Sequence, residues 1–182
     1  MASVVNFLTT KLKLKVNAQK SAVAHPWDRK FLGFTFRKSE DSVKIAVHES
    51  RVKRLKDKIR GLNRKLRGNK VTDSIRRLIM PITRGWANYF SIADERGIFE
   101  SLDGWIRRKI RGVFWRQWKK ARTRCKQMIA LGLKEHTAKK WAYASKGPWR
   151  MAKTYGMHKA LSNSVIESLG YIPMMTLVCA RS

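Results

Sequence analysis

Acidic residues are scarce in this sequence. Only 12 Asp and Glu stand against 41 Lys and Arg, which gives a formal net charge of +29. Two-metal phosphoryl transfer needs several carboxylates in one place, and the few here do not cluster. The four His are scattered without HExxH spacing, and there is no glycine-rich phosphate loop. We therefore predict no catalytic residue, no metal ligand and no intrinsic cofactor.

Cysteines and long apolar runs are also scarce. Cys125 and Cys179 are the only cysteines, so neither a disulfide framework nor a CxxC zinc site can form. We expect a reducing, cytoplasmic setting. No apolar stretch approaches the ~18 residues that span a bilayer, and the amino terminus lacks the pattern of a secretory signal.

A positive field of this size attracts polyanions. An anionic membrane would require an exposed amphipathic helix, whereas the cations here spread over several helices that have their own apolar stripes. We therefore expect a nucleic-acid partner and no membrane. Hydrophobic residues make up 43% of the chain and seven are Trp, which is too many for a disordered basic tail.

The periodicity predicts a mainly α fold, α+β overall, in three parts. Residues 1–48 combine a helix over 1–12 with strand patterns at 12–16, 31–36 and 43–47. Residues 49–120 form three amphipathic helices, typical of a small bundle. Residues 121–182 hold further helices, with expected pieces at 121–131, 134–144 and 155–169, a turn at 145–149, and an apolar tail that packs on the body.

Within the bundle, we expect the first helix to start at Ser50 and to end at Gly68-Asn69. The second starts at Thr72 or Asp73, and Pro81 kinks or restarts it. The third runs from Asp94 to about Lys120. On that helix Asp103 precedes Arg107 by four residues, which favours a salt bridge between them.

From Gly104 to Lys134 there is no carboxylate but there are eleven Lys and Arg. Solvated helices usually mix both signs, so this imbalance costs stability unless a polyanion compensates it. The segment 51–67, whose only acid is Asp57, has the same property. The cations that we expect to contact the nucleic acid are Arg51, Arg54, Lys58, Arg107, Arg108, Arg111, Arg116, Lys119 and Lys120.

Aromatic residues interleaved with these cations could stack on unpaired bases. Trp115 and Trp118 lie at the edge of the apolar stripe, so base stacking and core packing stay equally open for them. Trp86 and Trp105 fit the apolar stripes and are expected in the core. Trp149, after Gly147-Pro148, is expected to be a packing anchor.

Several segments resemble one family. LKLKVNAQKSAV followed by KFLGFTF resembles the last palm segments of retroelement reverse transcriptases. RRLIMPITRGWANYF and LDGWIRRKIRGVFWRQWKK resemble the maturase-specific (X, or thumb) domain of group II intron reverse transcriptases. ASKGPWR and HKALSNSVIESLG resemble the DNA-binding region of the same proteins. The resemblance covers residues 7–173.

The resemblance implies a palm remnant at 1–48, a helical thumb at 49–120 that grips intron RNA for splicing and mobility, and a DNA-binding-like region at 121–182. The chain departs from the family pattern, because the YADD-type box and the other palm carboxylates are absent. Members of the family are RNA-directed DNA polymerases, but we expect this chain to be inactive alone. The start within the palm suggests a truncated gene product or half of a split enzyme.

The leading hypothesis is thus an RNA-binding maturase fragment, with group II intron RNA as partner and target DNA as a further candidate. The first alternative is the non-catalytic part of a split reverse transcriptase. A separate chain would then supply the fingers and the catalytic palm, and Mg²⁺ would enter with it. The second alternative is a basic helical DNA- or ribosome-binding protein unrelated to introns.

Overall fold

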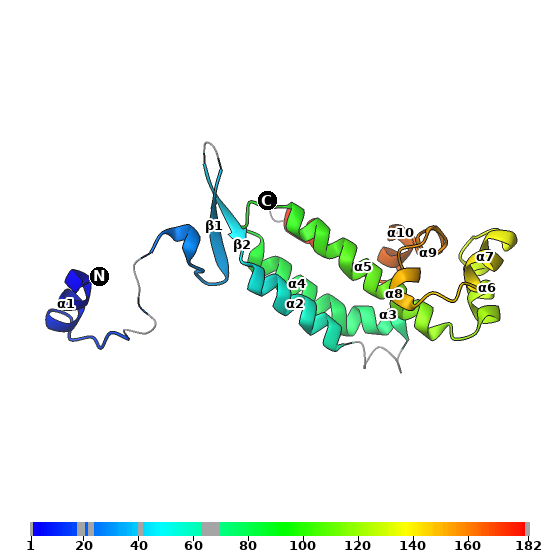
Figure 1. The fold of residues 1–182 in the computed structure, drawn as a ribbon, viewed down its shortest axis with the longest axis horizontal. Coiled ribbons are helices and arrows are strands. Elements are labelled where there is room, and N and C mark those ends of the chain that lie inside the picture. Colours follow the sequence, from blue (N-terminus) through cyan, green and yellow to red (C-terminus); the bar gives the residue numbers. More distant parts are fainter. Residues whose placement is uncertain (1, 18–20, 22–23, 40–41, 63–69, 181–182) are drawn as a thin grey trace.

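The computed structural model describes residues 2–17, 21, 24–39, 42–62 and 70–180. It is elongated, with the amino-terminal helix at one end, a β-hairpin beside the central helical bundle, and a group of short helices at the other end (Figure 1). The mainly α prediction is confirmed, because the described residues form many helices and one two-stranded antiparallel sheet. No helix in the described ranges is long and apolar enough to cross a membrane.

The amino-terminal part contains α1 (Ala2–Thr10), the 3-10 turn η1 (Pro26–Asp28), β1 (Phe34–Lys38) and β2 (Val43–Val47). The strands pair antiparallel, from Phe34 opposite Val47 to Lys38 opposite Val43. Residues 12–16 form no strand, so that prediction was wrong. Alternation alone does not make a strand, because a strand also needs a neighbour for its backbone groups.

The strand expected at 31–36 begins only at Phe34, because a tight turn precedes it. The backbone N–H of Phe34 donates to the Phe31 carbonyl over 2.9 Å, and the reverse bond is 3.0 Å. Leu32 and Gly33 between them have φ values of 53° and 96°, as in a type I′ turn. Gly33 supplies the left-handed conformation that this turn requires.

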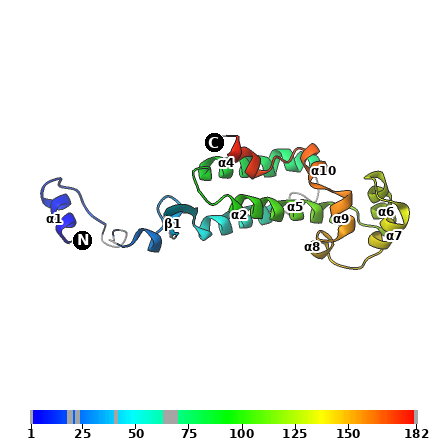
Figure 2. The ribbon, with the colours of Figure 1, turned by 90° about the horizontal axis from the view of Figure 1, so that it is seen from above.

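The bundle consists of α2 (Glu49–Gly61), α3 (Val71–Ser74), the π-helical turn η3 (Ile75–Ile79), α4 (Met80–Phe90), α5 (Gly97–Gln117) and α11 (Met174–Cys179). Figure 2 shows α4 and α11 in one layer and α2 and α5 in the other. The core includes Leu55, Ile59, Ile75, Ile79, Phe99, Leu102, Ile106, Ile110 and Met174. The apolar tail therefore packs on the body, as predicted.

Two helix starts differ in detail from the sequence pattern, whereas Pro81 restarts the second helix as predicted. His48, not Ser50, caps α2, and its Nδ1 accepts from the Ser50 N–H over 3.2 Å. Lys70 precedes the second helix in place of Thr72 or Asp73. Pro81 lies at the start of α4 after the π-helical turn, which accommodates a residue that cannot donate to the preceding turn. The predicted helix end at 68–69 lies outside the described residues.

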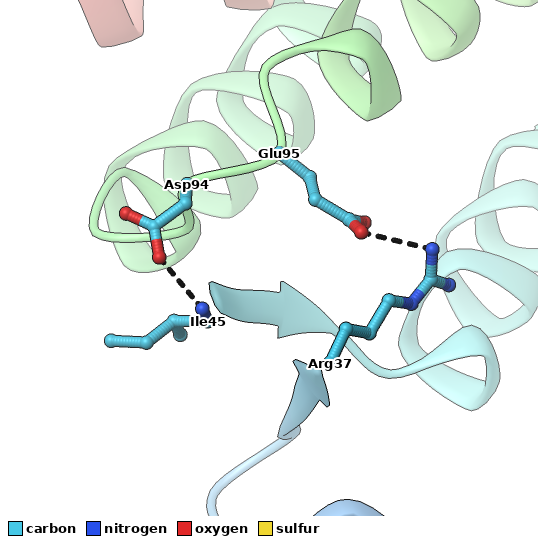
Figure 3. A network of polar contacts seen from close by, with 4 residues as sticks. All are labelled: Arg37, Ile45, Asp94 and Glu95. Atoms are coloured by element: carbon cyan, nitrogen blue, oxygen red, sulfur yellow. Dashed lines mark hydrogen bonds and ion pairs between the residues drawn. The ribbon is translucent and has the colours of Figure 1, made fainter. Parts of the chain in front are cut away.

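Asp94 and Glu95 do not start a helix but attach the hairpin to the bundle (Figure 3). Asp94 Oδ2 accepts from the Ile45 N–H over 2.7 Å, and the Asp94 N–H donates to the Ile45 carbonyl over 2.9 Å. Glu95 pairs with Arg37 at 2.9 Å. The expected start of the third helix at Asp94 was therefore wrong, and α5 begins at Gly97.

Asp103 is buried, and it does not form the expected salt bridge with Arg107. Its Oδ1 accepts from the Tyr171 hydroxyl over 2.5 Å and from the Met174 N–H over 2.9 Å. Its Oδ2 accepts from the Met175 N–H over 3.1 Å. The carboxylate thus satisfies the free N–H groups at the start of α11, where negative charge is also favoured.

The end of the molecule opposite the hairpin contains α6 (Ala121–Ala130), α7 (Glu135–Ala142), α8 (Pro148–Met151), α9 (Tyr155–Ala160) and α10 (Asn163–Ser168). The expected helix 155–169 is two helices, because Ser162 caps α10 by accepting from the Val165 N–H. Gly170, with φ 104°, closes α10 as predicted. Gly156 packs so closely on Trp141 that a Cβ there would lie 2.3 Å from its ring.

We predict that Asp103→Asn destabilises the fold by about 2 kcal/mol or more, because its amide group would face buried N–H donors that then lack an acceptor. Chemical denaturation measures the change in the free energy of unfolding. Glu100→Gln, an exposed acid on the same helix, is the control and should cost under about 0.5 kcal/mol. Equal losses in the two variants would contradict the capping role of Asp103.

We also predict that the apolar faces hold the bundle. Ile79 is 2% exposed, so Ile79→Ala should cost about 2–5 kcal/mol. Lys58 is exposed on α2, so Lys58→Ala should change stability by under about 0.5 kcal/mol. Unfolding curves of the two variants test which side of each helix is buried. Equal losses of stability would contradict this assignment.

Candidate nucleic-acid interface

Helix α2 is a basic ridge between two grooves. Leu55 and Ile59 anchor it in the core, and its cations project on both sides. A groove of about 530 Å³ separates it from α4. The α2 wall carries Arg51, Arg54 and Lys58, while α4 contributes an apolar and aromatic wall of Pro81, Ile82, Trp86, Tyr89 and Phe90. All three cations predicted on α2 therefore line one groove.

The second groove, of about 1110 Å³, lies between α2, the end of the hairpin and the start of α5. Lys53, Lys56 and Arg60 line its α2 side. Two acids, Glu49 and Glu95, line this groove together with four cations, Arg37, Lys53, Lys56 and Arg60. Glu95 binds Arg37 at 2.9 Å, and Asp57, on α2 outside the groove, binds Arg60 at 2.6 Å. Cations therefore outnumber acids on the walls of the second groove.

Trp105 on α5 lies beside this groove, and three cations surround its indole. Lys109 Nζ lies 5.3 Å from the ring centroid, the Arg60 guanidinium 5.6 Å and Lys56 Nζ 5.9 Å. Distances of this size allow cation–π attraction. The indole is half-buried, so the expectation that it belongs to the core is only partly correct. It packs against the core and also helps to gather cations from two helices.

Trp149, at the start of α8, continues this arrangement. The Arg108 guanidinium lies 3.6 Å from its ring centroid, and Lys109 Nζ lies 4.5 Å from it. Arg108 also donates from Nε and Nη2 to the Trp149 carbonyl, over 3.2 and 2.9 Å. Trp149 still keeps 38% of its surface exposed. We call Lys56, Arg60, Trp105, Arg108, Lys109 and Trp149 the cation–aromatic cluster.

Burial and neighbouring positive charges lower the pKa values of cations in this cluster. Partial burial lowers the pKa of the Lys109 ammonium, and the charges of Arg60, Arg116 and Arg108 lower it further. Burial also lowers the pKa of Arg108. Neighbouring cations that depress one another's charged form are stabilised by a bound anion. The cluster is therefore suited to bind phosphate groups.

The cations predicted on the acid-free segment separate into different environments. Arg116, Lys119 and Lys120 are exposed at the end of α5 and just beyond it. Arg108 is half-buried in the cluster. Arg107 is half-buried on another side of α5, where its charge acts on Tyr171 and Arg111. The structure brings Arg108 and Arg116 to the side of α5 that carries Trp105.

Arg111 is not available for RNA, and its place in the predicted interface is corrected. It is 2% exposed, and it donates from Nε to the Leu161 carbonyl over 2.8 Å and from Nη2 to Asn163 Oδ1 over 3.0 Å. Burial and the charge of Arg107 lower its pKa to about 10. Arg111 remains charged at neutral pH and joins α5 to the connection between α9 and α10.

Trp115 and Trp118 belong to the core, which corrects their candidacy for base stacking. They are 1% and 8% exposed. Arg124 covers Trp115, with its guanidinium 4.1 Å from the ring centroid, and donates to the Trp118 carbonyl over 2.8 Å. With core packing and a cation around them, these rings offer no free face to a base.

Sequence reasoning did not single out Lys56, Arg60 and Lys109, and it expected Trp149 only as a packing anchor. A usable signal was present in the helical spacing. Trp105 and Lys109 are four residues apart, as are Lys56 and Arg60, so each pair shares a helix face. The contact between α2 and α5, which joins the two pairs, has no such signal in the sequence.

Comparison with known families agrees with this part of the fold. Residues 52–130, from α2 to the end of α6, match the group II intron, maturase-specific domain. A comparison with curated proteins finds no match to the chain. The family resemblance of RRLIMPITRGWANYF and LDGWIRRKIRGVFWRQWKK is thereby confirmed. The palm-like segment before residue 52 and the DNA-binding-like segment after residue 130 lie outside the match and stay predictions, as do the domain boundaries at 48 and 120.

The matched range contains most of the cation–aromatic cluster, nearly all of the groove between α2 and α4, and the α2 and α5 sides of the second groove. Over residues 52–130 the chain is therefore similar to the group II intron, maturase-specific domain.

Proposed function

We propose that this chain binds group II intron RNA through α2 and the neighbouring side of α5, and so holds the RNA for splicing and intron mobility. The observation that carries the proposal is the cation–aromatic cluster. There, cations from two helices of a maturase-specific domain converge on partly exposed indoles. Phosphate contacts from Arg54 and Lys58 on α2 and from Arg116, Lys119 and Lys120 beyond the cluster extend this surface.

The chain as a whole cannot neutralise this surface internally. Its 12 acids leave most of its 41 Lys and Arg without a carboxylate partner. Binding of RNA releases the cations condensed on its phosphates, so affinity arises largely from counterion release and depends steeply on salt. Contacts of this kind position an RNA without reading its sequence.

A role as one part of a split reverse transcriptase has its own support. The hairpin is a two-stranded sheet, and Phe31, Leu32 and Val43 beside or within it are exposed apolar residues. Free sheet edges with apolar flanks invite a further strand, which a chain with the fingers and catalytic palm could supply. That chain would bring the carboxylates and their Mg²⁺. The RNA surface proposed here serves either role, and target DNA is a further polyanion that it could hold.

The surface predicts a specific salt dependence. Arg116→Ala with Lys119→Ala, and separately Arg54→Ala with Lys58→Ala, should weaken binding of intron RNA and of unrelated structured RNA by similar factors. Each pair should flatten the slope of log affinity against log salt by roughly 1.4–1.8, since each lost phosphate contact contributes about 0.7–0.9. Filter binding over a salt series gives both quantities.

Lys139→Ala is the matched control for these variants. Lys139 is exposed but already pairs with Glu135 at 2.6 Å, so its loss should leave the slope unchanged. An unchanged slope in both double variants would remove α2 and the end of α5 from the RNA-binding surface.

We further predict that the chain alone has no polymerase activity, because it lacks a carboxylate cluster that could hold two metal ions. In the described ranges, no group of three or more His, Cys, Asp or Glu could hold a metal ion. Purified protein would be given a primed RNA template, dNTPs and Mg²⁺. Template-dependent extension that persists through further purification would refute this part of the proposal.

A further inference from the structure

We propose that the cation–aromatic cluster binds an unpaired nucleotide of the RNA, with its base on the Arg108–Trp149 stack and its phosphate between Lys109, Arg60 and Lys56. This inference rests on the proposed RNA-binding function and names the kind of RNA feature that the surface selects. It also assigns a binding role to Trp149, which the sequence pattern marked only as a packing anchor.

The stack is held in place before any RNA arrives. Two hydrogen bonds from Arg108 to the Trp149 carbonyl fix the guanidinium, which lies 3.6 Å from the indole centroid. A guanidinium and an indole are both planar groups on which bases stack. Because the pair is already ordered and Trp149 remains 38% exposed, stacking a base there costs little conformational entropy.

A phosphate position lies next to the stack. Lys109 Nζ is 4.5 Å from the Trp149 centroid and 5.3 Å from that of Trp105, so its ammonium lies between the two indoles. Arg60 and Lys56 approach Trp105 from α2. These cations come from two helices. Burial lowers the pKa of Lys109, and the positive charge of Arg60 lowers that pKa further. A phosphate among them would offset this repulsion.

An unpaired nucleotide fits these groups better than a continuous duplex does. In a duplex the faces of the bases are covered by their neighbours, so a duplex could use the cations but not the planar surfaces. A bulged or looped nucleotide can present one base face and its own phosphate together. Stacking of this kind is worth about 1–3 kcal/mol per base and hardly depends on base identity.

The test compares two RNA hairpins that differ in a single unpaired uridine, each bound to the full chain over a salt series. Wild-type protein should bind the bulged hairpin about 5- to 140-fold more tightly, which is 1–3 kcal/mol at about 1.4 kcal/mol per tenfold. Trp149→Leu and Arg108→Lys should each remove most of this preference. Neither should change the affinity for the paired hairpin by a comparable factor.

Arg108→Lys is the sharper variant, because it keeps the charge but loses the planar surface. The slope against salt should therefore stay the same while the preference for the bulge falls. Arg84→Lys is its matched control. Arg84 is an exposed arginine on α4, outside the cation–aromatic cluster, and its replacement should leave the preference unchanged. A thermal melt of each variant identifies any loss of folded protein.

A crosslinking experiment on the unaltered protein does not depend on how the variants fold. With 5-iodouridine at the bulge, photocrosslinking followed by mass spectrometry should find the adduct on Trp149 or Trp105. Adducts only elsewhere, or variants that weaken both hairpins equally, would overturn the proposal while leaving RNA binding intact. Wild-type protein that binds neither hairpin in a salt-dependent way would instead refute the proposed function itself.

Discussion

The fold depends on two buried charges on α5, both of which bind the carboxyl-terminal part of the chain. Asp103 accepts from the Tyr171 hydroxyl and from the first N–H groups of α11. Arg111, about two turns later, donates to Leu161 and Asn163. A buried charge without partners costs several kcal/mol, so these polar contacts permit one placement of residues 155–180 against the bundle.

This arrangement decides which side of α5 is left for a ligand. One side is covered by α11 and by the connection between α9 and α10. Trp105, Arg108, Lys109 and Arg116 recur at helical spacing on another side, next to α2 and Trp149. There the positive charge is held by cation–π contacts and hydrogen bonds to carbonyl groups more than by carboxylates. Helix α5 therefore packs against the carboxyl-terminal part of the chain on one side and contributes to the proposed RNA-binding surface on another.

Much of the bundle and the character of its ligand follow from the sequence by itself. The apolar periodicity of 52–66, 75–90 and 102–114 predicts three helices and their buried sides, because helical burial repeats every three or four residues. The excess of 41 cations over 12 acids predicts a polyanionic partner, and this prediction does not depend on the fold. The helix ends were predicted less accurately. His48 caps α2, and Asp94 and Glu95 bind the hairpin, and the apolar periodicity does not predict these contacts.

Only the tertiary structure decided which cations face a ligand. Arg111 and Arg108 lie three residues apart in the same acid-free segment, yet one is buried against Leu161 and the other stacks on Trp149. Trp115, for which core packing and base stacking were equally open, is buried, whereas Trp149, the expected packing anchor, keeps 38% of its surface exposed. Both outcomes depend on where residues 149–163 pack against α5. Such long-range contacts cannot be predicted from the spacing of apolar residues in the sequence. Local periodicity records which side of a helix is apolar, but not which distant polar groups will cover the rest.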